Sequence, residues 1–450
     1  MEAEHQDFSW QTQPQAAQQV RQSAMGFCDE IAFLADLAAA MQGKTGTRWT
    51  DWIDHFQLRD ESLLREQLRA VGFVCDADGT ATRWWHPGGL FPQYRLVANQ
   101  RPHLAIKVES VADFLAAHDL DSPIDGTPLA ALRTATVAEG PRSLLRVVER
   151  HGCRKHSCPQ PTADQVLAIL RHQEAFRLRR RDFADPLDGF AHARRLIENA
   201  HADIETDRTC DLFFAAERQY WQQRNRAAQI QKARQDTLGL GWANHDHHTY
   251  RSSREYFAEL IAVLESLGFV CRERFYGGAE AGWGAQVLEQ AATGIVIFAD
   301  VDLSPTEVTG DFAHDGLQQQ TELGTVGLWC KLHGEAFLQA GMHHLECQFD
   351  FDAARRQLAA EGIETMAPFT DFTYLKQAFT VGERWPIGAP RIDRLLATGQ
   401  ITAPQAAEFR ERGAIGSHLE ILERNQGYKG FNQTGISEII RDTDPRRAQP

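Results

Sequence analysis

An internal repeat in the second half of the chain constrains the fold most strongly. Segments 246–268 and 343–362 each open with a strand-like run that contains a His-His pair, continue into a helical pattern and end at a glycine. The first copy then adds three strand-like runs, at 269–275, 282–289 and 294–301. A strand, a helix and three strands form a βαβββ unit, so the repeat predicts two such units side by side.

The second copy has the same order with an insertion. A strand-like run at 372–381 is followed by two short helical patterns, 391–399 and 403–413, and by a last strand at 417–424. Glycines at 239 and 241 mark a domain boundary before the repeat. We therefore predict an α+β fold whose paired βαβββ modules form a partly closed mixed sheet: a mostly helical region with a few strands (1–240), a first module (241–310), a connector (311–340) and a second module (341–450).

Local signals support this division. Thr162 with Gln165, and Ser252 with Glu255, have the spacing of a capping box at a helix start. Gly268 stands where a helix C-terminal cap belongs. One face of the helix before it carries the apolar residues Phe257, Leu260, Ile261 and Leu264.

Charge and cysteine usage exclude several classes of protein. The net charge of −14 disfavours non-specific binding to nucleic acid or to an anionic membrane. The sequence has no apolar run long enough for a transmembrane helix, and its start lacks the pattern of a secretory signal. Eight scattered cysteines indicate reduced thiols in a cytoplasmic protein. The sequence leaves open a homo-oligomer.

Three strands of the repeat offer metal-ligand side chains on a polar face. Side chains alternate across a strand, so His247 shares a face with Thr249 and Arg251, and His344 shares one with Glu346 and Gln348. On the last strand, Glu420 lies with His418 and Arg424, while Leu419 and Ile421 face the packed side. Two imidazoles and one carboxylate, here His247, His344 and Glu420, hold Fe(II) with positions open for O₂ and substrate, and also suit Mn²⁺ or Zn²⁺.

These motifs resemble the vicinal-oxygen-chelate superfamily, and within it the 2-oxoadipate dioxygenase/decarboxylase (hydroxyglutarate synthase) family. The strand Asp246–Arg251 is similar to that family's DHxxYR strand, His344-Leu345 to its second His strand, and Glu420-Ile421 followed by Arg424 to its Glu strand. The order of ligands is also similar to that of 4-hydroxyphenylpyruvate dioxygenase. The resemblance covers about residues 241–440 and implies the ligands His247, His344 and Glu420.

The resemblance also implies substrate contacts. Arg251 would bind a substrate carboxylate, and the run Leu375-Lys376-Gln377 is similar to a Leu-Arg-Gln strand of the family, with Lys376 where the family tends to have Arg. Lys376 and Gln377 are therefore candidate substrate-binding residues, with Arg251 and Gln377 as candidate catalytic residues.

Each candidate has a rival. His248 competes with His247, His343 with His344, and Glu423 with Glu420, since simple alignment of the two copies pairs His247 with His343. Arg251 is also compatible with a structural ion pair. Glu346, Gln348 and His418 are either supports that orient ligands or plain polar lining.

Two other motifs are weaker. The cluster His151-x-Cys153-x-x-His156-x-Cys158 contains soft metal ligands, but its spacing matches no common zinc finger, which favours a surface loop. The glycine-rich segment 277–284 lacks a phosphate-loop lysine and indicates a hairpin turn.

Three functions follow as hypotheses. The first is an Fe(II)- and O₂-dependent dioxygenase/decarboxylase acting on a small 2-oxo acid, such as a 2-oxoadipate-like dicarboxylate. The second is another divalent-metal enzyme of the same scaffold, such as an extradiol-type dioxygenase, a lyase or an isomerase. The third is a small-molecule binding protein without catalysis.

Overall fold

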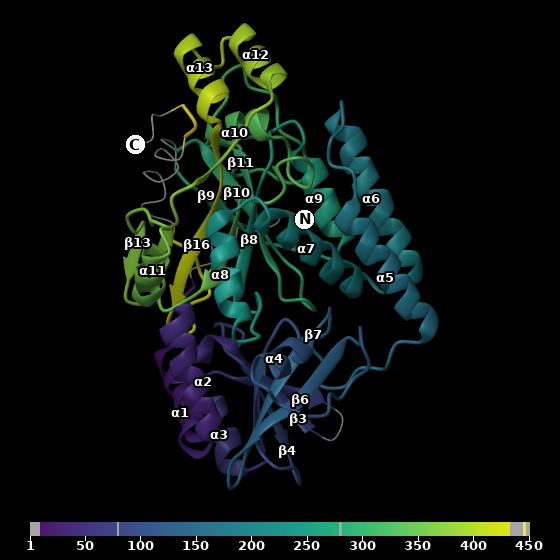
Figure 1. The fold of residues 1–450 in the computed structure, drawn as a ribbon, viewed down its shortest axis with the longest axis vertical. Coiled ribbons are helices and arrows are strands. Elements are labelled where there is room, and N and C mark those ends of the chain that lie inside the picture. The colour runs from purple at the N-terminus through teal and green to yellow at the C-terminus, as the bar shows by residue number, and fades with distance from the viewer. Residues whose placement is uncertain (1–9, 79–80, 279–280, 433–443, 447–450) are drawn as a thin grey trace.

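The chain folds into an α+β architecture with two mixed sheets, which confirms the predicted fold class. The structure is a computed structural model, and it describes residues 10–78, 81–278, 281–432 and 444–446. In Figure 1 the N-terminal sheet lies below and the C-terminal sheet above it, with α12 and α13 at the far end.

The C-terminal sheet consists of the two predicted modules. Its strands follow the order β13-β14-β16-β12-β8-β11-β10-β9, with β15 paired to β16, so the sheet is an open path rather than a closed ring. The two His-His strands, β8 and β12, pair antiparallel at its centre. The first module contains β8 (His245–Arg251), α9 (Phe257–Ser266), β9 (Val270–Tyr276), β10 (Trp283–Glu289) and β11 (Val296–Asp302).

The second module follows a connector that contains α10 (Thr325–His333). Its final strand, β16, lies parallel to β12 and antiparallel to β14, which places it beside the centre of the sheet. The elements of the module are β12 (His344–Gln348), α11 (Phe351–Ala360), β13 (Thr370–Phe372), β14 (Leu375–Phe379), β15 (Glu383–Trp385), α12 (Ala389–Ala397), α13 (Ala403–Arg412) and β16 (Ala414–Arg424).

The helix of the first module buries the predicted face but starts later than predicted. Phe257, Leu260, Ile261 and Leu264 are fully buried, and Gly268 closes the helix with a φ of 84°. The predicted capping box is wrong, because α9 begins at Phe257 and the Ser252 hydroxyl instead donates to Ser253 and Glu335. The capping box of Thr162 and Gln165, by contrast, is confirmed.

A second sheet in the N-terminal region has the order β2-β3-β4-β1-β5-β7-β6. Its seven strands are more than the few strands that were predicted for residues 1–240. Helices α1 and α2 pack on this sheet, since Phe27 and Leu34 share a core with Phe56 and Leu104. The elements are α1 (Pro14–Glu30), α2 (Ala32–Ala40), the short helices Met41–Thr45 and Trp49–Trp52, β1 (Ile53–Arg59), α3 (Ser62–Ala70), β2 (Val74–Asp78), β3 (Ala81–Trp85), β4 (Gln93–Val97), β5 (His103–Lys107), α4 (Val111–Ala117), β6 (Leu132–Glu139) and β7 (Leu144–Arg150).

The two sheets repeat one topology. Strand β1 pairs parallel with β4 and antiparallel with β5, just as β8 pairs with β11 and β12. Strand β7 then pairs parallel with β5 and antiparallel with β6, as β16 does with β12 and β14. The region before residue 240 therefore contains its own pair of strand–helix–strand modules.

A layer of helices joins the two sheets. Phe190 of α6, Phe213 and Phe214 of α7 and Ala228 of α8 share one core with Phe257 of α9. This layer buttresses the face of β8 that lies opposite His247. The helices are α5 (Ala163–Leu178), α6 (Pro186–Asp203), α7 (Thr206–Gln222) and α8 (Arg226–Asp236).

The cysteines depart from the prediction at one place. Cys153 and Cys158 form a disulfide, so the prediction of reduced thiols is wrong for this pair. Two sulfurs so close in sequence meet because the loop that follows β7 folds back on itself. The other six cysteines are free. Among the described residues, no helix has both the length and the apolar character needed to cross a bilayer.

Candidate metal centre

The register of three adjacent strands brings the predicted ligands together. His247 of β8 lies opposite Glu346 of β12, and Glu346 lies opposite Glu420 of β16. Residues directly opposite each other in neighbouring strands point to the same face of a sheet. These three side chains therefore form one row across the sheet, and His344 stands two residues away from Glu346 on the same face.

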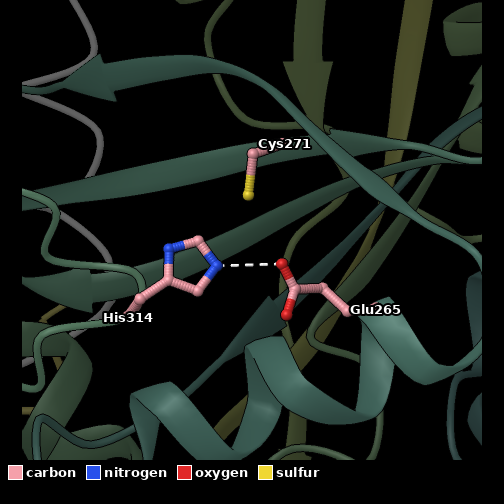
Figure 2. Close-up of side chains that lie close together, drawn as sticks. All are labelled: Glu265, Cys271 and His314. Atoms are coloured by element: carbon pink, nitrogen blue, oxygen red, sulfur yellow. Dashed lines mark hydrogen bonds and ion pairs between the residues drawn. The ribbon is translucent and has the colours of Figure 1, made fainter. Parts of the chain in front are cut away.

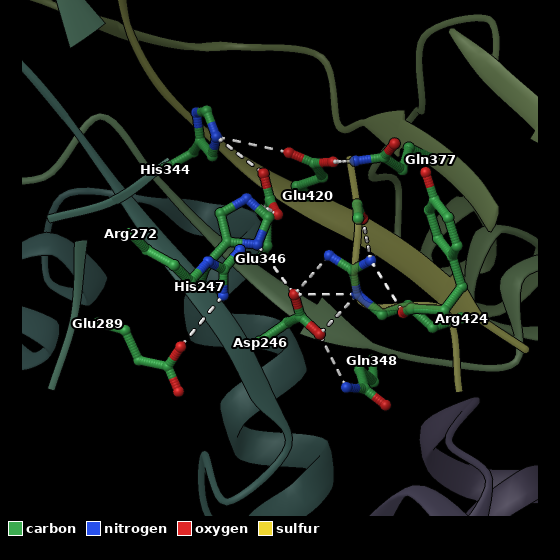
Figure 3. Close-up of polar contacts among 12 residues, drawn as sticks. Asp246, His247, Arg272, Glu289, His344, Glu346, Gln348, Gln377, Glu420 and Arg424 are labelled. Atoms are coloured by element: carbon green, nitrogen blue, oxygen red, sulfur yellow. Dashed lines mark hydrogen bonds and ion pairs between the residues drawn. The ribbon is translucent and has the colours of Figure 1, made fainter. Parts of the chain in front are cut away.

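The side chains of this row are in contact, as Figure 3 shows. His344 Nε2 lies 3.3 Å from Glu346 Oε1 and 3.4 Å from Glu420 Oε2. His247 Nε2 contacts the other oxygen of Glu346. All four residues are buried, with exposed fractions between 1% and 6%. The structure thus gathers two imidazoles and two carboxylates in one buried cluster.

Glu346 has a more central place than the sequence indicated. It lies between His247 and His344, and it belongs to both groups of side chains whose ligand atoms come close enough to hold an ion, Asp246-His247-Glu346 and His344-Glu346-Glu420. Strand alternation placed it on the correct face. Alternation alone does not give the register between strands, which decides that Glu346 faces both His247 and Glu420.

A group of polar residues behind His247 fixes the orientation of its ring. Asp246 Oδ1 lies 2.9 Å from His247 Nδ1, and the Arg424 guanidinium donates to both oxygens of Asp246. Gln348 donates to Asp246 Oδ2 over 2.8 Å. A carboxylate on Nδ1 leaves Nε2 of the imidazole as the free ligand atom. Gln348 is therefore a support of this kind.

Gln377 supports the other end of the row. Its Nε2 donates to Glu420 Oε1 over 2.8 Å, which leaves Glu420 Oε2 facing His344. Lys376 is not brought to the centre, because adjacent residues of a strand point to opposite faces. Its ammonium group instead lies 3.5 Å from Asp352 and above the ring of Phe351.

The rival residues lie elsewhere. His248 faces the helical layer, with Arg218 3.3 Å from its Nε2. His343 packs against Trp329, and its Nδ1 lies 2.7 Å from Nδ1 of His344. Glu423 accepts the backbone N–H of Phe351 and pairs with Arg48. His418 of β16 lies opposite His344, and its Nδ1 is 2.9 Å from the carbonyl oxygen of Thr380.

Arg251 and Asp300 form a second polar pair near the row. They lie opposite each other on β8 and β11, and Asp300 Oδ2 is 3.9 Å from Arg251 Nε. Both are buried, yet Arg251 Nε and Asp300 Oδ1 make no hydrogen bond within the described residues. Burial raises the pKa of Asp300 to about 8. Asp300 was not among the predicted site residues, although it is the one acidic residue in the apolar run 294–301.

The electrostatics of the row fit a divalent cation. Burial and the neighbouring carboxylate raise the pKa of Glu346, and burial raises the pKa of Glu420 to about 7. Burial lowers the pKa of His247 to about 4, so its imidazole is neutral. Facing buried carboxylates are costly unless a proton or a cation neutralises them. Neutral imidazoles and carboxylates are ligands that Fe(II), Mn²⁺ and Zn²⁺ accept.

Metal affinity is therefore expected to rise with pH. A ligand carboxylate must lose its proton before it binds a metal, and the pKa of Glu420 is raised from 4.5 to about 7. As the pH rises toward 7, we expect the Kd for Mn²⁺ to fall by roughly tenfold per pH unit for each proton released. As the pH rises over the same range, metal-free protein should lose stability, because Glu420 holds a proton in the folded state that it has lost in the unfolded state.

Calorimetric titration of the metal-free protein in buffers of different ionisation enthalpy measures this proton release directly. The Glu423→Gln variant serves as the control, because Glu423 lies away from the row and its loss should leave the pH dependence of the Kd unchanged. A Kd independent of pH between 5 and 8 would contradict the prediction.

A second group of metal-type side chains lies at the surface. Figure 2 shows Glu265, Cys271 and His314, with His314 Nε2 2.8 Å from Glu265 Oε1. All three are exposed. Hydrogen bonds to Glu265 and to Asp311 raise the pKa of His314, so an imidazole held between two carboxylates accounts for the cluster. It needs no metal.

Comparisons with known proteins give only remote likenesses. No protein-family model matches the chain, and no curated protein matches it. Among solved structures, methylmalonyl-CoA epimerase from Mycobacterium tuberculosis is 13% identical and covers 40% of this chain and 88% of its own, with a TM-score of 0.24. A putative glyoxalase superfamily protein from Ralstonia eutropha is 11% identical and covers 59% of this chain and 97% of its own, with a TM-score of 0.32.

A mutant of 4-hydroxymandelate synthase from Streptomyces coelicolor matches over a longer stretch. It is 14% identical, covers 89% of this chain and 98% of its own, and has a TM-score of 0.28. TM-scores this low do not establish a common function, so the function of this chain has to be argued from its own residues.

Proposed function

We propose that this chain is a non-haem Fe(II)-dependent dioxygenase that decarboxylates a small 2-oxo acid. The observation that carries the proposal is the buried row of His247, Glu346 and Glu420 with His344 beside it. Two imidazoles and a carboxylate on one face of a site leave positions open for O₂ and substrate. Bound Fe(II) would supply the site for the 2-oxo carboxylate and the activation of O₂.

The favoured substrate is a 2-oxoadipate-like dicarboxylate, with a 2-hydroxy acid one carbon shorter and CO₂ as products. The reaction balances without an external reductant. CO₂ leaves with the two oxygens of the substrate's 1-carboxylate, while O₂ supplies one oxygen atom to the new carboxylate at the former 2-oxo carbon and one to the hydroxyl on the neighbouring carbon. A dicarboxylate suits Arg251, a buried guanidinium whose nearest carboxylate, Asp300, is 3.9 Å away and is held protonated by its raised pKa. Such a guanidinium binds a carboxylate in a bidentate manner.

The protein's own residues would then divide the work. His247, His344 and Glu420 would hold the metal, Asp246 would fix the His247 ring and Gln377 would orient Glu420. Phe431 and Phe298, whose rings contact His247, would keep water from that side of the centre.

Oxygen consumption tests the proposal. Protein loaded with Fe(II) under anaerobic conditions is mixed with a panel of 2-oxo acids, and O₂, CO₂ and the hydroxy acid are quantified together. The proposal expects equal amounts of the three with at least one dicarboxylate. It fails if protein that holds one iron per chain consumes no O₂ with any member of the panel.

A second candidate function is a redox-neutral metal enzyme, a lyase or an isomerase. The presence of Glu346 favours it, because a second carboxylate would fill a position that O₂ needs. Such an enzyme would turn over its substrate without O₂ and with Mn²⁺ or Zn²⁺ in place of Fe(II).

Removal of the Arg251 guanidinium is expected to weaken substrate binding. In the Arg251→Met variant, loss of a charged hydrogen-bond donor should raise KM by roughly 10- to 100-fold, while metal content stays at the wild-type level. Lys376→Met is the matched control, because Lys376 faces away from the centre and should leave KM unchanged. Steady-state kinetics of both variants measure the two KM values. A raised KM in Lys376→Met alone would contradict the assignment of Arg251 as the substrate-binding residue.

A further inference from the structure

The N-terminal sheet contains a counterpart of the metal centre at the same place in the fold. His55 lies opposite Ala105, as His247 lies opposite Glu346, and Ala105 lies opposite Arg146, as Glu346 lies opposite Glu420. His103 stands two residues before Ala105, as His344 stands before Glu346. The two histidines are therefore repeated, whereas the two carboxylates are replaced by alanine and arginine.

The supporting residues are repeated as well. Asp54 Oδ2 lies 2.7 Å from His55 Nδ1, and Arg150 donates to both oxygens of Asp54 over 2.7 and 2.8 Å. This is the arrangement of Asp246, His247 and Arg424 in the metal centre. Arg150 follows Arg146 by four residues, just as Arg424 follows Glu420. The support that orients an imidazole is thus present without the acidic ligands.

These side chains line a cavity of about 250 Å³. His55 and His103 are buried, and their Nε2 atoms lie 3.2 Å apart, so one hydrogen lies between them. His156, from the loop closed by the disulfide, packs edge-on against the His55 ring at 4.5 Å. The cluster of histidines and cysteines noted in the sequence thus contributes His156 and Cys158 to this wall of the cavity.

The cavity carries positive charge. Arg95, Arg146 and Arg150 line it; Arg150 is neutralised by Asp54, and Arg95 donates to Gln57. Arg146 donates to the Thr134 hydroxyl over 2.7 Å, and its Nε is buried and makes no hydrogen bond in the part of the chain that the structure describes. Asp125, on the rim, is exposed. A cation is disfavoured in this setting, whereas an oxyanion gains charge-assisted hydrogen bonds.

We infer that the N-terminal sheet binds a small oxyanion, a carboxylate or a phosphate group of a small molecule, in the cavity between His55, His103 and Arg146. The guanidinium of Arg146 occupies the position that Glu420 has in the metal centre and reverses the charge preference of the site. The Asp54 carboxylate accepts the hydrogen of neutral His55 at Nδ1, and His103 donates to His55 Nε2, so the donors to the anion come from Arg146 and the two imidazoles form an uncharged wall. The cavity volume limits the anion to a few heavy atoms beyond the anionic group. The inference does not rest on the proposed function.

Calorimetric titration of the full-length protein tests the inference, with inorganic phosphate and succinate as separate probes and the metal centre loaded with Mn²⁺. At least one probe is expected to bind with a Kd below about 1 mM. The Arg146→Gln variant should weaken that binding by roughly 10- to 100-fold, the loss expected for one charged hydrogen bond. Arg59→Gln is the control, because Arg59 is an exposed residue on the same strand as His55.

Further measurements separate this result from misfolding and from a metal site. An unchanged urea-unfolding midpoint in Arg146→Gln shows that the variant is folded, and His103→Gln, which changes the other wall, should weaken binding of the same probe. Phosphate binding without succinate binding identifies a phosphate site, and the reverse identifies a carboxylate site. The inference is overturned if neither probe binds, if Arg146→Gln binds like Arg59→Gln, or if Zn²⁺ titration yields a second equivalent that His103→Gln abolishes.

Discussion

The His344→Ala variant is expected to lose its stoichiometric metal and, with it, all turnover that depends on the metal. His344 Nε2 faces both carboxylates of the row, at 3.3 Å from Glu346 and 3.4 Å from Glu420. Loss of a residue that only supports a ligand typically costs 10- to 100-fold in metal affinity. Loss of a ligand should cost more, so metal analysis after dialysis should find less than about one tenth of an equivalent.

The same measurement on four further variants defines the ligand set. His247→Ala and Glu420→Ala should behave like His344→Ala. His248→Ala is the matched control, since it removes a neighbouring histidine that faces the helical layer. His343→Ala removes a side chain that contacts the His344 ring, so it should keep the metal with an affinity lowered by roughly 10- to 100-fold. Retention of a full equivalent of iron by His344→Ala, with loss in His343→Ala, would move the site to the rival residue and contradict the assignment.

The Glu346→Gln variant tests whether Glu346 is itself a metal ligand. If Glu346 is a ligand, this variant loses metal as Glu420→Ala does. If it lies beside the metal without binding it, the variant keeps the metal with an affinity lowered by roughly 10- to 100-fold. The visible absorption of bound Co²⁺ reports the difference, because its intensity depends on the number of ligands.

Alternation along single strands sufficed to predict which faces carry the ligands. His247, His344 and Glu420 all lie on the predicted polar faces, because their neighbours Tyr250, Leu345 and Ile421 are apolar and pack against helices. Alternation does not say how strands are shifted against each other. The central place of Glu346 depends on that shift, and so does the proximity of Arg251 to Asp300.

The duplication of the N-terminal sheet was also present in the sequence. Asp54-His55 and Arg59 repeat the spacing of Asp246-His247 and Arg251, and Gly-Phe-Val-Cys occurs both at 72–75 and at 268–271. The repeat is less plain at β7, because Arg146 and Arg150 line a polar cavity and interrupt the apolar run of Leu144, Leu145, Val147 and Val148. Charged residues on a strand face that lines a site weaken the signal on which strand prediction depends.

The Glu217→Ala variant is expected to lose about 3–5 kcal/mol of stability, the cost of breaking a buried ion pair. Glu217 of α7 is completely buried and accepts from Arg179 over 2.6 Å and from Arg181 over 2.5 Å. Burial alone would raise the pKa of Glu217, but the two arginines outweigh it and leave the pKa lowered. Its removal would leave two guanidinium groups buried without their carboxylate.

The three side chains also join separate parts of the fold. Arg179 donates to the carbonyl of Phe337 in the connector, and the Tyr250 hydroxyl lies 3.4 Å from Glu217. Tyr250 belongs to β8, the strand that carries His247, so the helical layer contacts this strand on the face opposite His247. Stability gained from the pair exists above the unfolded pKa of Glu217 and is lost as pH falls through the lowered folded value.

Urea unfolding of Glu217→Ala at pH 7 measures the loss. Glu139→Ala is the control, because its pair with Arg101 is exposed and should contribute no more than about 1 kcal/mol. The triple variant Arg179→Met/Arg181→Met/Glu217→Leu should recover much of the lost stability, since apolar side chains of similar volume can replace a buried ionic cluster. A loss below about 1 kcal/mol in Glu217→Ala would mean that water or another group reaches the guanidinium of Arg179, and that the helical layer does not hold β8 through this pair.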